Sequence, residues 1–287
     1  MLIDKVKRAA AGTLAAALLG VPGSAWADWG LNLPKGVTTI SHDVYDLHMM
    51  VIWICVVIGI VVFGAIFFSV IKHRKSKGAV AAQFHESTTV EIIWTVIPFV
   101  ILVGMAIPAS HVLIQEFNTK DAALTVKVTG YQWKWHYDYL NDGISFFSTL
   151  STPADEIYNG APKDKHYLRE VDHPLVLPVH TKIRFLVTSH DVIHSWWVPD
   201  FAIKADGIPG YIHSVWTEID KPGVYRGQCA ELCGWGHAFM PIVVVAKSKA
   251  DFAKWVAQEK AAAGGAAKAV RSGGRGALVR VSGSAAR

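Results

Sequence analysis

The sequence predicts an α+β membrane protein in which an N-terminal two-helix transmembrane hairpin is followed by an all-β domain. Three observations favour this class. The 287-residue chain is 52% hydrophobic and has a positive mean hydropathy. Two segments, residues 47–71 and 92–115, contain no Asp, Glu, Lys or Arg. From Leu124 onward, apolar and polar residues alternate with the period of a β-strand.

The first residues have the pattern of an export signal. A basic stretch at residues 5–8 precedes an apolar run over residues 14–21, and Ala-Trp-Ala at 25–27 has the form of a signal-peptidase site. We therefore expect residues 1–27 to be a cleaved signal peptide and residues 28–46 to be a periplasmic N-terminal segment.

The two apolar segments are each long enough to cross a hydrocarbon core of about 30 Å as a helix. A buried helix of a soluble protein is the alternative for segments of this kind. The intervening residues 72–91 begin with the basic run Lys-His-Arg-Lys-Ser-Lys, which the positive-inside rule assigns to the cytoplasm. We expect transmembrane helices at 47–71 and 92–115, a cytoplasmic loop at 72–91, and both chain ends in the periplasm.

Residues 116–257 are predicted to form the β domain, as a sandwich or barrel. Alternation runs from Leu124 to Tyr139 and changes phase at Gly130, which predicts a bulged strand. The aromatic residues Trp135, Tyr137 and Tyr139 are expected in its core. Further short strands are expected at residues 182–189, 212–219 and 241–247, with a surface insertion at 151–173.

The charge distribution bears on partners. The net charge of +5 arises from basic residues at the two chain ends, whereas residues 116–257 are mildly acidic. Nucleic acid is therefore not an expected partner, and a basic protein is compatible with the acidic domain. Residues 258–287 consist mainly of Ala, Gly, Ser and Arg, and we expect this basic tail to be disordered.

A cluster of soft ligands lies near the end of the domain. Cys229, Cys233, His237 and Met240 follow the spacing C-x3-C-x3-H-x2-M, and His194 lies upstream in H-D-V-I-H-S-W-W-V-P. Thiolates, imidazoles and a thioether suit copper that cycles between Cu(I) and Cu(II). Two cysteines are enough to bridge a pair of copper ions, so the pattern predicts a copper site.

Three other interpretations of the cysteines compete with copper. A Cys229–Cys233 disulfide suits an oxidising compartment but leaves His194, His237 and Met240 unexplained. A structural zinc site would use Cys and His alone, because Met is a poor zinc ligand. Redox thiol chemistry of the C-x-x-C kind requires a spacing one residue shorter.

At this point the sequence resembles subunit II of the bacterial cytochrome c oxidases, which are haem-copper oxidases. The resemblance covers about residues 43–247 and includes the helix hairpin, G-Y-Q-W-K-W-H-Y, K-A-D-G-I-P-G and the cysteine loop. It implies a cupredoxin-like domain that holds a dinuclear copper centre, CuA. Cytochrome c would donate electrons to this centre, which would pass them to haem in subunit I for oxygen reduction to water coupled to proton pumping.

The resemblance also implies roles for individual residues. Cys229 and Cys233 would bridge the copper ions, His194 and His237 would be the imidazole ligands, and the weak axial ligands would be Met240 and the Glu231 carbonyl. The Glu231 side chain would also bind a magnesium or manganese ion shared with subunit I, which suits a carboxylate. A solvated loop acid is the alternative for Glu231.

Three further residues each have a second interpretation. Trp133 matches the residue through which electrons enter, although an aromatic at strand alternation is commonly part of the core. Glu91 matches a carboxylate at the entrance of a proton channel, and an acid at a helix N-terminus also stabilises the helix dipole. Asp191 is a candidate partner for the His194 imidazole or a turn acid.

The resemblance places the protein in the bacterial inner membrane as a multi-pass subunit, with its copper domain in the periplasm and the other oxidase subunits as partners. Tyr211 departs from the family, in which many members carry Arg after I-P-G. No C-x-x-C-H occurs in the chain, so we expect a separate cytochrome c as donor. The rival functions are a quinol-oxidase subunit, which would lack the copper ligands, and a membrane-tethered copper-delivery protein.

Overall fold

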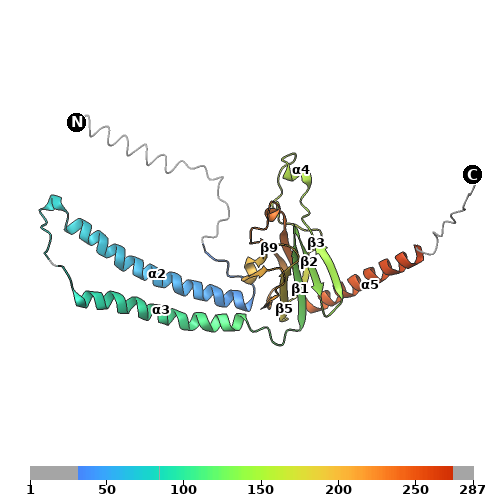
Figure 1. The fold of residues 1–287 in the computed structure, drawn as a ribbon, viewed down its shortest axis with the longest axis horizontal. Coiled ribbons are helices and arrows are strands. Elements are labelled where there is room, and N and C mark those ends of the chain that lie inside the picture. The colour runs from blue at the N-terminus through green and yellow to red at the C-terminus, as the bar shows by residue number, and fades with distance from the viewer. Residues whose placement is uncertain (1–31, 84, 274–287) are drawn as a thin grey trace, which may run out of the picture. The chain divides into compact units, whose positions relative to one another are not determined.

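The structure is a computed structural model that describes residues 32–83 and 85–273. The predicted signal peptide, residues 1–27, and residues 274–287 of the predicted tail lie outside the described residues. The described chain consists of two long helices, a β domain and a C-terminal helix (Figure 1).

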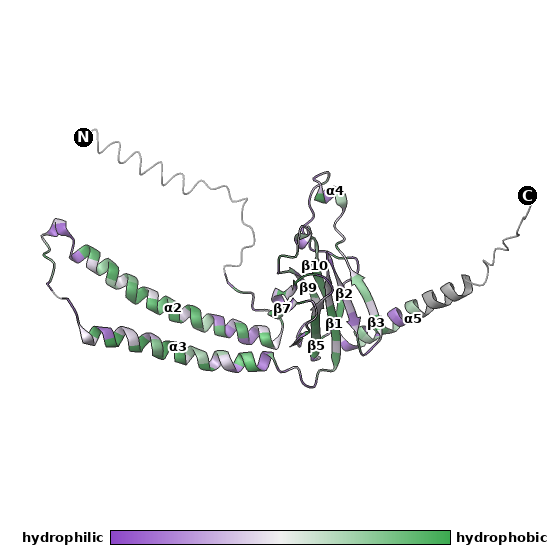
Figure 2. Cartoon of the chain, viewed as in Figure 1, coloured by the Kyte–Doolittle hydropathy of each residue, from purple (hydrophilic) through white to green (hydrophobic). Residues whose placement is uncertain are grey.

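The two long helices are α2 (Thr39–Lys72) and α3 (Thr88–Glu116), which are linked through a 3-10 turn, η1 (Lys75–Lys77). Both are long and apolar enough to cross a membrane, and hydrophobic residues predominate along them (Figure 2). Large apolar side chains such as Phe63 and Trp94 are about 60% exposed (61% and 62%), which requires a lipid or protein partner. The chain is thus a membrane protein with a C-terminal soluble domain.

Both helices begin before the predicted spans at 47 and 92. The polar residues ahead of the apolar run add turns to α2, and a capping box fixes its start: Thr38 Oγ1 accepts from the Ser41 N–H at 3.0 Å, and Ser41 Oγ accepts from the Thr38 N–H at 2.9 Å. The hydrophobic period finds the apolar part of a helix and does not detect its polar end.

The segment before α2 is hydrogen-bonded to the β domain. The Val37 N–H donates to the Asp200 carbonyl at 3.0 Å, and the Val37 carbonyl accepts from the Asp220 N–H at 2.8 Å. The buried Thr38 hydroxyl donates to the Phe201 carbonyl at 3.1 Å. These contacts attach the start of the first membrane helix to the domain that follows the second.

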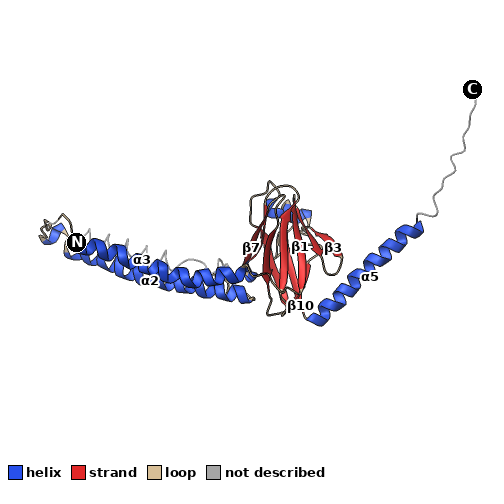
Figure 3. Cartoon of the chain, turned by 60° about the horizontal axis from the view of Figure 1, so that its bottom comes forward, coloured by secondary structure: helices blue, strands red, loops and turns tan. Residues whose placement is uncertain are grey.

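The β domain is a sandwich of two five-stranded sheets, with strand orders β3-β2-β1-β5-β8 and β4-β10-β9-β6-β7 (Figure 3). The pairs β1–β5 and β10–β4 are parallel, and the other pairs are antiparallel. This confirms the predicted fold class, with a cupredoxin-like sandwich rather than a barrel. The strands are β1 (Leu124–Tyr131), β2 (Lys134–Tyr139), β3 (Ile144–Ser148), β4 (Leu175–Pro178), β5 (Ile183–Ser189), β6 (His194–Val198), β7 (Ile203–Gly207), β8 (His213–Thr217), β9 (Gly223–Cys229) and β10 (Pro241–Lys247).

The phase change at Gly130 has a different origin from the predicted bulge. Strands β1 and β2 form an antiparallel hairpin in which Tyr131 pairs with Lys134, so residues 132–133 form a tight turn. Reversal of the chain, rather than an inserted residue, shifts the alternation. The expected aromatic core is confirmed, because Trp135, Tyr137 and Tyr139 are each at most 1% exposed.

The remaining helical pieces are α4 (Ala154–Ile157), η2 (Pro199–Phe201), η3 (His237–Phe239) and α5 (Lys249–Gly273). The α4 turn lies within the predicted insertion at 151–173. Disorder was predicted from residue 258, yet the structure continues α5 to Gly273. Phe252 and Trp255 pack on the sandwich, and the alanines that follow cannot build a core but have the highest helix propensity.

Candidate metal centre

The soft ligands lie at the ends of adjacent strands. His194 begins β6, Cys229 ends β9, and Met240 immediately precedes β10. Strand pairing sets their register: the Ala230 N–H donates to the Ser195 carbonyl at 3.0 Å, and the Cys229 N–H donates to the Met240 carbonyl at 3.3 Å. The backbone therefore brings together ligands that are separated by up to 46 positions.

The two sulfurs form the middle of the site. Cys229 Sγ and Cys233 Sγ are 3.8 Å apart. His194 Nδ1 lies 4.0 Å from Cys229 Sγ, and His237 Nδ1 lies 3.7 Å from Cys233 Sγ. Met240 Sδ is 3.6 Å from Cys233 Sγ. Each thiol thus has one imidazole beside it.

These donors fit a bridging soft metal. Both cysteines are free, and a metal–thiolate bond of about 2.3 Å lets one ion span sulfurs up to about 4.6 Å apart. The Glu231 carbonyl lies 3.3 Å from Cys229 Sγ and supplies an oxygen to complement the thioether. His194, Cys229, Cys233 and Met240 are all at most 4% exposed, so the protein excludes water from most of the site.

Asp191 orients His194. Its Oδ1 lies 2.9 Å from His194 Nε2, which leaves Nδ1 directed at Cys229. The same carboxylate accepts the N–H groups of Val192 and Gln132, both at 2.7 Å. Asp191 is therefore both a turn acid and an imidazole partner, and it links His194 to the β1–β2 turn.

Gly130 gives His194 its space. A Cβ at this position would lie 2.7 Å from His194 Cδ2, closer than nonbonded carbons approach. The glycine that we interpreted as a bulge signal is instead required for close packing of the imidazole against β1.

The two thiols differ in acidity. Burial opposes ionisation of Cys229, but the hydrogen bond with His194 and neighbouring backbone groups outweigh it and lower the pKa of Cys229 to about 7. Burial and the adjacent Cys229 raise the pKa of Cys233 to about 12. For Asp191, burial acts to raise the pKa, and the hydrogen bonds from His194, Val192 and Gln132 hold the pKa below its usual range.

Trp133 contacts the ligand loop. Its Nε1 donates to the Cys233 carbonyl at 3.1 Å, and Gln132 Nε2 donates to the same carbonyl at 3.0 Å. Trp133 is half-buried, and Trp235 packs against it with ring centroids 4.5 Å apart. Trp133 is therefore neither a free surface residue nor part of the strand core.

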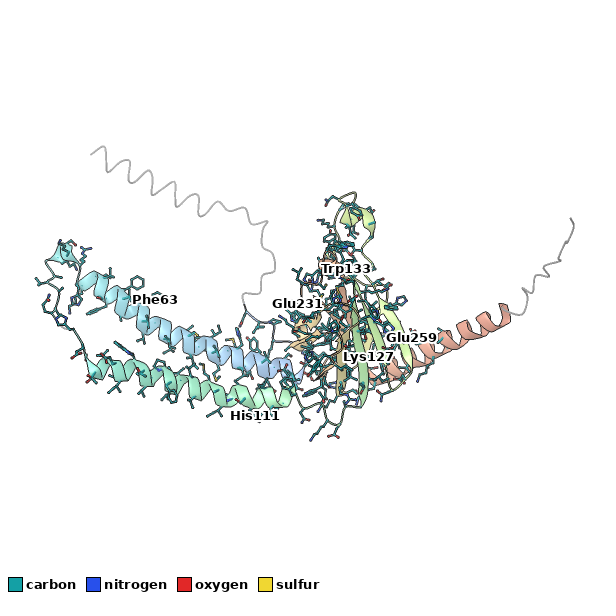
Figure 4. The ribbon with its side chains drawn as sticks, in the orientation of Figure 1. Phe63, His111, Lys127, Trp133, Glu231 and Glu259 are labelled. Carbon is teal, nitrogen blue, oxygen red and sulfur yellow. The ribbon has the colours of Figure 1, made fainter. Side chains whose placement is uncertain are left out.

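Glu231 and Glu91 are the two other acids that we expected to be functional. The Glu231 side chain is exposed on the ligand loop of the β domain, where Figure 4 labels it. Glu91 lies in the first turn of α3, where its N–H donates to the Ser87 carbonyl. The structure thus places Glu91 at a helix N-terminus, as both of its interpretations require.

Sequence reasoning missed Trp235, the contact of Gly130 with His194 and the link from Asp191 to Gln132. The sequence did contain a signal for Trp235: a tryptophan between two glycines in a short ligand loop has few neighbours that could bury it, so its exposure could have been predicted.

Comparisons with known proteins agree on one family. The family model described as "Cytochrome C oxidase subunit II, periplasmic domain" matches residues 124–247, and that of the transmembrane domain of the same subunit matches residues 26–112. A probable cytochrome c oxidase subunit 2 from Rickettsia bellii is 41% identical, with 83% of this chain and 87% of the relative covered. The subunit 2 of Arabidopsis thaliana is 35% identical, covering 80% and 90%. The crystal structure of the periplasmic domain of subunit II of cytochrome oxidase (CoxB) of Bradyrhizobium japonicum is 40% identical, covering 50% of this chain and 96% of that one, with a TM-score of 0.44.

Proposed function

Because the chain belongs to the cytochrome c oxidase subunit II family and is thus a subunit of a haem-copper oxidase, we propose that its soft ligands hold a dinuclear copper centre of the CuA type. Cytochrome c would donate electrons there, and haem in subunit I would receive them. Oxygen reduction to water and proton pumping would take place in the assembled oxidase.

One observation carries the proposal: two free thiols 3.8 Å apart, each with one imidazole nitrogen about 4 Å away (4.0 and 3.7 Å). When bound, a copper pair supplies one-electron redox chemistry with little change in geometry. The protein supplies the rest. Cys229, Cys233, His194 and His237 would hold the copper pair, and Met240 and the Glu231 carbonyl would supply weaker ligands.

The surrounding residues hold these ligands in place. Asp191 fixes the tautomer and direction of His194, because its carboxylate accepts the Nε2 proton. Trp133 and Gln132 hold the Cys233 carbonyl from the β1–β2 turn. Burial of the donors keeps water away, which limits the reorganisation that accompanies electron transfer.

Burial also argues against a copper-delivery protein. A carrier that hands copper to a partner needs accessible ligands, whereas His194 is 0% and Met240 1% exposed. A quinol-oxidase subunit without a metal would have no use for two buried, unpaired thiols. Both rival functions are thus less compatible with the site than electron transfer.

We place the β domain in the periplasm, with the loop between α2 and α3 in the cytoplasm of a bacterial inner membrane. The exposed Glu231 carboxylate would bind magnesium or manganese together with subunit I. Glu91 would lie at the entrance of a proton channel, and Trp133 on the electron path.

Copper loading of the detergent-solubilised full chain tests the proposal. We expect a purple protein whose paramagnetic resonance spectrum shows one unpaired electron shared equally by two coppers. Cys229→Ser is expected to abolish that spectrum, with Cys55→Ser in the first membrane helix as the matched cysteine control. A colourless or mononuclear site, or a purple Cys229→Ser variant, would contradict the assignment.

A further inference from the structure

We propose that Trp235, and not Trp133, is the residue that the electron-donating haem protein contacts on this chain, with Trp133 continuing the path inward. This inference rests on the proposed function. The path would run from the exposed indole of Trp235 to Trp133 and then to the Cys233 carbonyl.

Trp133 is covered by the ligand loop. A Cβ at Gly236 would lie 2.3 Å from Trp133 Cδ2, and one at Gly234 would lie 3.0 Å from Trp133 Cζ2. The backbone on both sides of Trp235 therefore packs directly on the Trp133 indole. Only glycines allow this approach, and Gly234 also has φ of +117°. The Trp133 indole therefore has little exposed surface that a partner protein could contact.

Trp235 lies on the outside of that cover. It is 80% exposed, and its ring is tilted 58° to Trp133 with centroids 4.5 Å apart. Leu232, also on the loop, is 79% exposed. Tryptophan is enriched at protein interfaces, where it often contributes a large share of the binding energy.

The occupant that fits is the exposed edge of a haem in a basic one-electron donor protein. A flat apolar porphyrin edge matches an exposed indole, and the acids beside the site, Asp191 and Glu231, suit a basic rim. The step balances as a single electron: ferrous haem iron is oxidised to ferric, and the copper pair is reduced by one electron. No bond forms or breaks, and no proton moves.

The connection inward is short. Trp133 Nε1 donates to the Cys233 carbonyl at 3.1 Å, and Cys233 is a proposed bridging ligand. The route from the exposed ring to the metal ligands thus uses one ring contact and one hydrogen bond. This pair differs from an ordinary surface cluster because Trp235 is exposed and Trp133 is hydrogen-bonded to the backbone of a proposed ligand.

The test uses the assembled oxidase that carries the full chain with Trp235→Leu or Trp235→Phe. The control is Leu140→Ala, because Leu140 is 55% exposed and follows the end of β2 opposite the Trp133 turn. Binding of oxidised cytochrome c is measured by surface plasmon resonance, so that no electron is transferred. Stopped-flow reduction by reduced cytochrome c, the size of the oxidase by light scattering and the copper spectrum are recorded in parallel.

We expect Trp235→Leu to weaken binding and slow the bimolecular step by about tenfold or more, with Trp235→Phe within about threefold of wild type. The copper spectrum and the Leu140→Ala variant should be unchanged. Unaltered binding and rate in Trp235→Leu would overturn the inference, as would a change in oligomeric size with donor binding intact, which would indicate a second copy as the occupant. A wild-type oxidase without the copper spectrum would instead overturn the proposed function.

Discussion

Asp191→Asn is the sharpest test of how the proposed copper site is held. The carboxylate receives four hydrogen bonds: His194 Nε2, the Val192 N–H and the Ser189 hydroxyl meet Oδ1 at 2.9, 2.7 and 3.4 Å, and the Gln132 N–H meets Oδ2 at 2.7 Å. An asparagine has one acceptor oxygen, which can keep the bonds made to Oδ1. Its amide NH2 then faces the Gln132 N–H. Both groups are donors, so the hydrogen bond from Gln132 is lost.

The expected magnitude follows from this geometry. Loss of one hydrogen bond to a charged acceptor costs about 1.5–3 kcal/mol in the free energy of unfolding. Loss of the negative partner of a ligand imidazole lowers metal affinity about 10–100-fold, or about 1.4–2.7 kcal/mol. We expect both effects in the same variant, because Asp191 serves the ligand and the turn together.

The assays are competition for copper against a chelator of known affinity and thermal unfolding of the metal-free protein. Asp138→Asn is the matched control, since Asp138 also pairs with an imidazole, His136, at 3.2 Å and has the same 26% side-chain exposure as Asp191. Copper affinity within twofold of wild type in Asp191→Asn, or an equal loss in Asp138→Asn, would refute the reasoning.

Three further outcomes are expected. Met240→Leu should keep the proposed copper pair but shift its potential, because the thioether, 3.6 Å from Cys233 Sγ, would be a weak ligand. Redox titration of the visible band checks this, and an unchanged potential would exclude Met240 as a ligand. Copper loading should release protons from Cys233, whose pKa is raised to about 12, from Cys229, whose pKa is lowered to about 7, and from His194, whose pKa is raised above its ordinary value. The number of protons released should increase as the pH falls through 7 in an unbuffered titration, because Cys229 and His194 are then protonated before copper binds, and release that grows with rising pH would contradict the assignment. Thr38→Val should lower the free energy of unfolding by about 1–3 kcal/mol, because the Phe201 carbonyl loses its donor and the Ser41 N–H loses its acceptor; an unchanged denaturant midpoint would contradict this.

The sequence predicted what is periodic or local. Apolar runs identified both membrane helices, and alternation identified a β domain whose aromatic residues Trp135 and Tyr137 are core. The hairpin at Gly130 was predicted as a bulge because both change the phase of alternation, and only strand pairing distinguishes them. The helix beyond residue 257 was missed because composition that prevents a core does not prevent a helix.

The site shows the same division. Residue types and their spacing predicted that His194 and the cysteine loop supply metal ligands, because the chemistry of a ligand is visible in a short stretch of sequence. The contacts of Gln132 with Asp191 and of Trp133 with Trp235 cross 59 and 102 positions of sequence. They depend on how the β1–β2 turn and the ligand loop pack, which no single-segment pattern contains.

The hydrogen bonds of Val37 and Thr38 to Asp200, Phe201 and Asp220 have a mechanical consequence. These bonds join the chain ahead of α2 to the sandwich, so the domain can move away from the start of the membrane anchor only if they break. The rate of electron tunnelling falls exponentially as the distance between donor and acceptor increases. A domain that moved freely on its anchor would therefore transfer electrons rapidly only in the positions where this distance is short. Under the proposed function, these hydrogen bonds would help to keep the distance between the metal centre and its electron acceptor constant.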